Sequence, residues 1–270
     1  MAATTSCRAA ASRAGRTVDD DVRRALLERL IDHAALFPPA SMSMEDALAE
    51  DRVARGSPYA WMLDRFVCPA SRLGELDGLD APVSVVLDGS LSSPAEAIEV
   101  RLTEPVPVPR DLLDRASRLR ELSPEVYFEP VLDDGWRDSV PAAIGAIAAV
   151  GARVKLRCGG EVVPTVEQVA LVLVACREAG VVMKATAGLH HPLRRGEEHG
   201  FLNLLCAAIH APEGTTTTVD LLRVESLDDL PLASLTAGEV RTARERLFKG
   251  FGSCSWREPV DDLRALGVLE

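Results

Sequence analysis

The chain has 270 residues, of which 30 are basic and 41 acidic, so its formal net charge is −11. This balance excludes the basic surface with which proteins bind the phosphate backbone of nucleic acids, and we expect no nucleic-acid partner. The composition is 47% hydrophobic and 26% charged, which excludes a wholly disordered or collagen-like chain. The most apolar stretches, 142–152 and 169–176, are shorter than the roughly 20 residues that cross a bilayer, so we expect no membrane span.

The N-terminal region differs in composition from the rest of the chain. Residues 1–16 are rich in Ala, Ser, Thr and Arg and lack acids, which predicts a disordered tail; an organelle transit peptide has the same composition and is the alternative. Six cysteines are spread along the chain without a CxxC pair or a signal-peptide core. That pattern is typical of reduced thiols, and we expect a cytoplasmic protein.

Residues 17–60 are expected to form an N-terminal helical appendage. Apolar residues recur with helical spacing over 18–36, and Thr17 stands where a capping residue would. Ser43 followed by Asp46 predicts the start of a second helix, which runs to about Arg55.

From residue 61 onward, short β-branched runs alternate with helical segments. The predicted strands are 64–69, 83–88, 97–103, 126–130, 153–158, 181–187 and 247–255, and the predicted helices include 110–122, 140–150, 166–179, 200–209 and 237–246. Alternating strands and helices predict a parallel sheet with helical crossovers. If an eighth strand lies near 219–224, residues 61–270 would form a (β/α)8, or TIM-like, barrel. This barrel could be regular or irregular. An open doubly wound sheet is the alternative.

Polar side chains recur on one side of four predicted strands. Because side chains alternate across a strand, the apolar positions should face the helices and the polar positions the barrel lumen. This rule directs the following residues inward: Ser84, Asp88, Tyr127, Glu129, Lys155, Arg157, Lys184 and Thr186. Active sites of such barrels lie at the carboxyl ends of the strands. The polar positions therefore predict a site there, and a structural ion-pair network is the alternative.

Lysine is rare in this chain. Only Lys155, Lys184 and Lys249 occur, beside 27 arginines, and all three fall on predicted strands. Arginine cannot replace lysine where a deprotonated amine must act as nucleophile or base. We therefore expect Lys184 to be the nucleophile or base, with its pKa lowered by the like charges of Lys155 and Arg157. Arg157 would bind a carboxylate or phosphate of the substrate.

Three of the five histidines, His190, His191 and His199, fall within one short segment at a predicted strand end. Histidines there suit proton transfer, and we expect His190 or His191 to act as acid or base together with Glu129. The spacing matches no strong zinc motif, so we expect no cofactor. The alternative is a divalent metal ion held by His190, His191, His199 and Glu129.

Other polar residues near predicted strand ends are expected to contact the substrate. Beside Arg157, these are Asp88, Thr186, His199, Asn203, Lys249 and Ser253. His199 and Asn203 lie on one stripe of a helix whose other positions are apolar. Lys249 and Ser253 lie on the last predicted strand, which has small residues and glycines of the kind that bind phosphate through backbone N–H groups. Close packing of these glycines is the alternative.

Two lysine motifs resemble those of the deoxyribose-phosphate aldolases. VVMKATAG is similar to the Schiff-base strand of that family, K-T-S-T-G, and KLRCGG is similar to its second lysine strand, K-x-x-G-G. The resemblance implies that Lys184 is the imine lysine and Lys155 its electrostatic partner. The two motifs stand in reversed order here, and the HHP and HGFLN segments have no counterpart. FPPA, KLRCGG, TAGLHHP and HGFLN together also resemble a bacterial family of (β/α)-barrel-like proteins, a resemblance that implies no activity.

The sequence therefore favours an enzyme that acts on a small anionic carbonyl or carboxylate compound by lyase, aldolase-like, or isomerase chemistry. A metal-dependent lyase or hydrolase is one alternative, and a barrel that binds a ligand without catalysis is another. We expect a small-molecule substrate, and a homo-oligomer is compatible with the sequence.

Overall fold

The computed structural model describes residues 18–270, which form a closed barrel of eight parallel strands in chain order. The predicted (β/α)8 architecture is confirmed. The tail predicted over 1–16, and Thr17 with it, lies outside the described residues. The strands are β1 (Ile31–His33), β2 (Leu63–Pro69), β3 (Val83–Val86), β4 (Ala97–Arg101), β5 (Glu125–Glu129), β6 (Arg153–Arg157), β7 (Met183–Thr186) and β8 (Phe248–Ser253).

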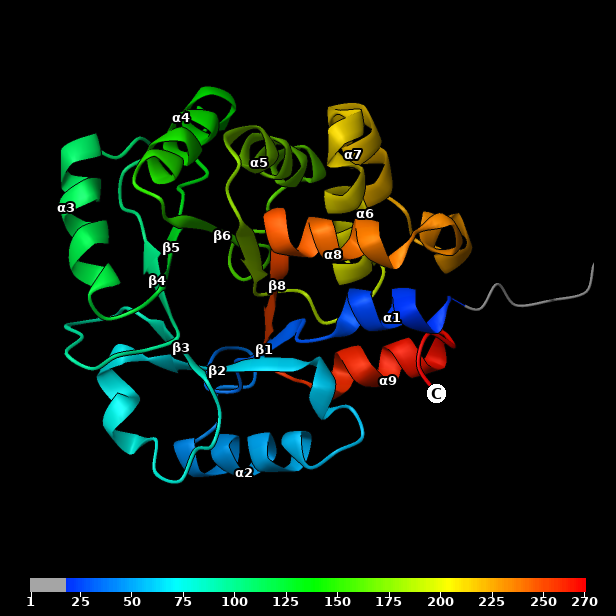
Figure 1. Ribbon diagram of the computed structural model, residues 1–270, viewed down its shortest axis with the longest axis horizontal. Helices are drawn as coiled ribbons and strands as arrows, with labels where there is room; N and C mark the ends of the chain where they lie inside the picture. Colours follow the sequence, from blue (N-terminus) through cyan, green and yellow to red (C-terminus); the bar gives the residue numbers. More distant parts are fainter. Residues whose placement is uncertain (1–17) are drawn as a thin grey trace, which may run out of the picture.

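Nine α-helices of the described residues surround these strands (Figure 1). They are α1 (Asp20–Leu27), α2 (Met44–Arg55), α3 (Pro109–Arg120), α4 (Trp136–Ala149), α5 (Val166–Ala179), α6 (Phe201–His210), α7 (Thr215–Leu222), α8 (Ala237–Arg246) and α9 (Arg257–Ala265). The barrel is irregular on one side, because β2 is followed by a short 3-10 helix, Ala70–Glu75, and no helix separates β3 from β4. None of the helices within 18–270 combines the length and the apolar character that a membrane span requires.

Helix starts follow the local sequence signals. The Ser43 hydroxyl accepts a hydrogen bond from the backbone N–H of Asp46 at 3.1 Å, as predicted for α2. The starts of α5 and α8 are reciprocal capping boxes, in which the side chain of the third helical residue returns to the capping threonine. These short-range patterns satisfy backbone donors locally, so tertiary contacts do not alter them.

The strand that closes the barrel is β1, and it lies in the segment expected to be a helical appendage. The helix predicted over 18–36 ends at Leu27, and Ile31 enters the sheet three residues after the capping residue Glu28. β1 pairs with β2 on one side and with β8 on the other. The segment expected to be an appendage therefore contributes β1 to the barrel, and a boundary at residue 61 would divide it.

The position predicted for an eighth strand, 219–224, is also wrong. These residues lie at the end of α7 and just after it. Short apolar runs fit a helix as well as a strand, so periodicity alone does not separate them. Long-range pairing decides, because the place between β8 and β2 is filled by β1.

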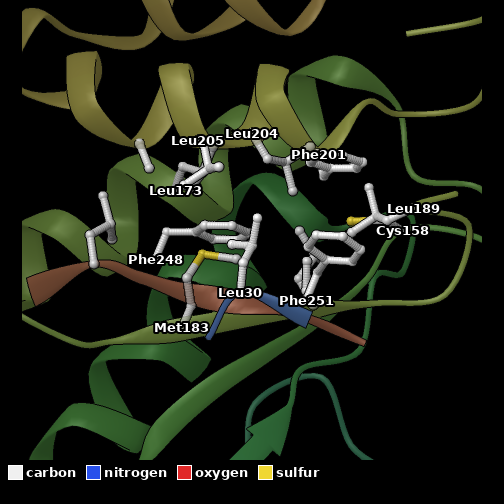
Figure 2. Close-up of a cluster of buried hydrophobic side chains, with 14 of the residues drawn as sticks. Leu30, Cys158, Leu173, Met183, Leu189, Phe201, Leu204, Leu205, Phe248 and Phe251 are labelled. Atoms are coloured by element: carbon white, nitrogen blue, oxygen red, sulfur yellow. The ribbon is translucent and has the colours of Figure 1, made fainter. Parts of the chain in front are cut away.

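The apolar core lies between the barrel wall and the helices (Figure 2). On β8, both Phe248 and Phe251 belong to this outer core although they are three residues apart. A bulge makes this arrangement possible, because Met183 pairs with Phe248 whereas Ala185 pairs with Phe251. The Phe251 ring stacks on Phe201 of α6 with ring centroids 4.8 Å apart. The rings of Phe248 and Phe251 are thus directed outward, away from the lumen.

The five cysteines within residues 18–270 are buried and form no disulfide. They belong to the packed interior, as is usual for free thiols.

Candidate functional site

Two lysines on neighbouring strands lie side by side in the barrel lumen. Lys155 of β6 is in register with Lys184 of β7, and the two residues are only 3% and 1% exposed. Both reach the same carboxylate, that of Glu99 on β4. Lys184 Nζ lies 2.6 Å from Glu99 Oε1, and Lys155 Nζ lies 3.4 Å from Glu99 Oε2. Glu99 thereby holds together two ammonium groups that would otherwise repel each other.

Each lysine also has a second carboxylate of its own. Lys184 is paired with Asp32 of β1, and Lys155 Nζ lies 2.8 Å from Glu129 Oε2 on β5. The lumen therefore contains three carboxylates around two amines. A buried charge without such partners would cost several kcal/mol, so this balance is what allows the lysines to be inside.

Hydrogen bonds from other strands fix two of these carboxylates. The hydroxyl of Ser84 on β3 donates to Glu99 Oε1 at 2.7 Å, as its predicted inward orientation requires. The backbone N–H of Arg65 on β2 donates to Asp32 Oδ1 at 3.1 Å. The acceptors are thus positioned before any ligand arrives.

The electrostatics of the cluster follow from this pairing. Burial alone would raise the pKa of Glu99, but Lys184 and Lys155 outweigh it and lower the pKa to about 2. Burial alone would lower the pKa of Lys184, but Asp32 and Glu99 outweigh it and hold the pKa above its usual range. The predicted lowering of the Lys184 pKa by Lys155 and Arg157 is therefore wrong, because the groups nearest to its amine are carboxylates.

Toward the amino ends of the strands, a second charged cluster lies beneath the lysines. The Tyr127 ring centroid is 5.5 Å from Lys184 Nζ, and the phenol donates to Glu125 at 2.9 Å. Arg65 and Arg153 each contact Glu125, also at 2.9 Å. Burial, together with the charge of Glu125, raises the pKa of Tyr127 to about 12. This cluster fills the lower lumen, so a ligand would approach from the carboxyl ends.

At the carboxyl ends, two arginines flank Glu129. Arg157 of β6 and Arg101 of β4 place their Nε atoms 3.3 and 3.9 Å from Glu129 Oε1. Their side chains are 47% and 77% exposed. Within the described residues, no other acceptor pairs with either guanidinium. Two exposed guanidinium groups therefore flank a single carboxylate above the lysines, in a protein whose net charge is −11.

The structure brings together four of the residues expected at the site, Lys155, Lys184, Glu129 and Arg157. Thr186 is close to them, because it is in register with Arg157 at the end of β7, and its hydroxyl is buried without a hydrogen-bond partner among the described residues.

Asp88 does not face the lumen, which corrects the orientation predicted for it. β3 ends at Val86, so the alternation of side chains no longer applies at Asp88. Its exposed carboxylate accepts hydrogen bonds from the backbone N–H and the hydroxyl of Ser71.

The adjacent histidines contact α9 and not the lysines. His190 Nδ1 lies 2.8 Å from Glu258, and His191 Nδ1 lies 2.7 Å from Asp262. Cys254, through a 4.0 Å sulfur contact, and Glu258 raise the pKa of His190 to about 9.

His199 and Asn203 make structural hydrogen bonds. His199 is buried and contacts the Pro164 carbonyl at 2.7 Å. The Asn203 amide donates to the carbonyls of Leu221 and Val224 and accepts from the backbone N–H of Arg194. These bonds connect the loops around α6 and α7. The polar stripe in the sequence did not distinguish this structural role from ligand binding.

The metal site considered as an alternative is not assembled. His190, His191, His199 and Glu129 each have separate partners. Over residues 18–270, no three side chains of His, Cys, Asp or Glu converge as a metal ion would require.

The two residues of β8 that were expected to bind substrate occupy opposite ends of the strand. Lys249 is near the amino end, where its carbonyl accepts hydrogen bonds from the Arg244 guanidinium. Ser253 is at the carboxyl end, and its hydroxyl donates to the Ser255 carbonyl at 2.7 Å. Lys249 is thus separated from the mouth.

Three residues of the site were not singled out from the sequence. Glu99 carried a signal, since it is a charged residue between the apolar Ile98 and Val100 of a predicted strand. Arg101 follows on the same face at the end of that strand. Asp32 carried no such signal, because its segment reads as helix.

The protein resembles solved structures of aldolases in fold. The tetrameric deoxyribose phosphate aldolase from Aeropyrum pernix is 15% identical and has a TM-score of 0.54, covering 92% of this chain and 98% of that one. Two structures from Toxoplasma gondii ME49 named for the same activity are 14% identical, with TM-scores of 0.43 and 0.45, and cover 91% and 92% of this chain and 93% and 97% of theirs. No protein-family profile and no curated protein matches the sequence. At this identity, the similarity shows the (β/α)8 fold.

Proposed function

We propose that the protein is a lyase that forms an imine between a lumen lysine and a small carbonyl substrate, as class I aldolases do. The observation that carries the proposal is the pair Lys155 and Lys184, joined by the buried carboxylate of Glu99 beneath the exposed guanidinium groups of Arg101 and Arg157. Such a pair supplies a nucleophile and a fixed cation within one site. The fold similarity to an aldolase supports this choice among the reactions a barrel can host.

The contacts favour Lys155 as the imine-forming residue. Lys184 is held by two carboxylates and its pKa lies above its usual range, so it stays an ammonium group. The second contact of Lys155, to Glu99, is longer at 3.4 Å, and its other partner Glu129 lies toward the mouth. These roles are the reverse of those implied by the sequence resemblance, and they agree with the reversed order of the two motifs.

The reaction would begin when Glu129 takes a proton from the Lys155 ammonium group. The free amine adds to the substrate carbonyl carbon, and the hydroxyl formed leaves as water with a proton returned by Glu129. The resulting iminium ion accepts the electron pair of the carbon–carbon bond that breaks and becomes an enamine, while the hydroxyl-bearing carbon of the departing fragment becomes a carbonyl as its hydroxyl proton passes to a carboxylate. That proton then returns to the enamine carbon, which restores the iminium ion. Water then hydrolyses the imine. Lys184 stabilises the negative charge that develops on oxygen, and His190 and His191 have no step.

Borohydride trapping tests the proposal, because the chain contains only three lysines. The protein would be incubated with small aldehydes and ketones, including 2-deoxyribose 5-phosphate, and reduced with cyanoborohydride before peptide mass spectrometry. We expect a covalent adduct on Lys155 and none in Lys155→Met. Lys249, near the opposite end of the barrel, is the internal control. Labelling of Lys249 alone, or of no lysine, would leave the lumen cluster as a structural network in a non-catalytic barrel.

The A. pernix aldolase is tetrameric, and we propose that this protein also forms a homo-oligomer. Light scattering coupled to size-exclusion chromatography measures its mass in solution. A monomer at all concentrations would contradict this part of the proposal.

A further inference from the structure

The lysine cluster and the two arginines above it together carry more positive than negative charge. Three carboxylates, those of Asp32, Glu99 and Glu129, face the cations of Lys155, Lys184, Arg101 and Arg157. One positive charge is therefore unmatched, and the two most exposed members of the set are the arginines. An anionic ligand would complete the balance.

Glu129 shows how far apart the amine and the guanidinium groups lie. Its Oε2 is 2.8 Å from Lys155 Nζ, and its Oε1 is 3.3 Å from Arg157 Nε and 3.9 Å from Arg101 Nε. A single carboxylate thus reaches the amine with one oxygen and the arginines with the other. The amine and the guanidinium groups therefore lie within reach of one carboxylate, so a ligand that meets both with a carbonyl and an anionic group is short.

The glycine turns at the mouth pack closely against each other. Gly159 follows β6 and Gly188 follows β7, and a Cβ built on Gly159 would lie 2.6 Å from the Gly188 Cα. The two turns therefore fill each other's space. Neither glycine can be replaced by a residue with a side chain there, and the charged side-chain donors at this mouth are Arg101 of β4 and Arg157 of β6.

We propose that the substrate is a short oxo-carboxylate whose carboxylate is attached at or next to the carbonyl carbon, held by Arg101 and Arg157 while the carbonyl meets Lys155. This inference rests on the proposed function for the role of Lys155, and it adds the substrate class and Arg101 as a specificity-determining residue. Planar guanidinium groups bind carboxylates through paired N–H donors. The nearly complete burial of Lys155 restricts the site to small molecules.

The test compares compounds that differ in one feature. Pyruvate has the carboxylate beside the ketone, methyl pyruvate is its uncharged ester, 4-oxopentanoate carries the carboxylate further away, and dihydroxyacetone phosphate carries a phosphate. The concentration of each that gives half-maximal trapping on lysine would be measured for the wild type, Arg101→Gln, Arg157→Gln and the exposed control Arg223→Gln. Because both arginines are exposed, these variants should fold.

We expect the pyruvate concentration that gives half-maximal trapping to rise about tenfold in Arg101→Gln and Arg157→Gln, because each variant loses a charge-assisted hydrogen bond. Methyl pyruvate should be unaffected, and Arg223→Gln should match the wild type for both. Stronger trapping by dihydroxyacetone phosphate or 4-oxopentanoate than by pyruvate would overturn the substrate class. Equal effects of the variants on pyruvate and methyl pyruvate would overturn the role of the arginines while leaving the imine intact.

A binding measurement separates this inference from the proposed function. Oxamate has the pyruvate shape but an unreactive amide carbonyl, so it can bind without forming an imine. Calorimetry measures whether oxamate binds the wild type and whether Arg101→Gln and Arg157→Gln abolish this binding. If both hold and no compound gives a lysine adduct, the results would support the anion site and reject the lyase. Absence of oxamate binding to the wild type would reject the anion site whatever the trapping shows.

Discussion

At the scale of single residues, the lumen is unusual because charged groups take the place of the branched apolar layers that fill most barrels of this class. Lys155, Lys184 and Glu99 are each nearly inaccessible. Replacing a complete buried ion pair by apolar residues can be neutral, whereas removing one partner leaves an uncompensated charge. The cluster therefore makes the protein sensitive to single substitutions.

Glu99→Gln is expected to be the most damaging conservative change in the cluster. It keeps the shape of the side chain but removes the charge shared by Lys155 and Lys184, and we expect the free energy of unfolding to fall by about 3 to 5 kcal/mol. Urea denaturation followed by circular dichroism measures the change. Asp88→Asn is the matched control, because Asp88 is an exposed carboxylate and should cost under about 1 kcal/mol. Equal losses in the two variants would contradict the importance of the shared charge.

The carboxylate of Glu99 also makes the stability of the protein sensitive to acid. Its pKa is lowered in the folded state from 4.5 to about 2. The unfolded state therefore binds more protons in this interval, and the stability that ionised Glu99 contributes is present above pH 4.5 and lost as the pH falls through about 2. We expect the free energy of unfolding to decrease over this interval, less steeply in Glu99→Gln. Parallel slopes for the two proteins would show that other carboxylates cause the acid sensitivity.

At the scale of elements, β1 depends on its neighbours. It has only three residues, and β8 approaches it closely, since a Cβ on Gly250 would lie 2.4 Å from the Leu30 carbonyl oxygen. Glycine is required at this point by the distance between the two backbones. Asp32 lies at the centre of β1, so the contact between β1 and β8 also sets the position of a carboxylate in the site.

Gly250→Ala should therefore destabilise the barrel even though it adds one methyl group. The backbone of β1 or β8 must shift, and we expect a loss of about 1 to 3 kcal/mol in the free energy of unfolding. Gly145→Ala is the control, because Gly145 lies within α4 with no atom within 4 Å of an added Cβ, and it should gain up to about 1 kcal/mol from helix propensity. Thermal denaturation of the two variants distinguishes them. A neutral Gly250→Ala would show that β8 tolerates a wider spacing from β1.

At the scale of the whole molecule, closure makes the barrel one unit that includes its N-terminal part. β1 joins β2 to β8, and without it both strands would expose unpaired edges. The closing strand also brings Asp32 to Lys184 from 152 positions away in the sequence.

A truncated protein consisting of residues 61–270 tests this view. It lacks α1, β1 and α2, and we expect it to aggregate or remain unfolded, because the loss of β1 opens the sheet. Circular dichroism and size-exclusion chromatography would show this. A soluble fragment with the spectrum and cooperative melting of the intact protein would instead support an appendage outside the barrel.

The sequence by itself determined the barrel class, most strand and helix positions, the start of α2 at Ser43 and the inward direction of Lys155, Lys184, Glu129 and Ser84. These features follow from alternation, periodicity and capping, which act over a few neighbouring residues. Only the tertiary structure decided that residues 31–33 are a strand, that Glu99 and Asp32 hold the lysines, and that His190 and His191 turn to α9. The physical reason is that a strand register and an ion pair join residues far apart in the chain, and local patterns contain no information about which partner each will meet.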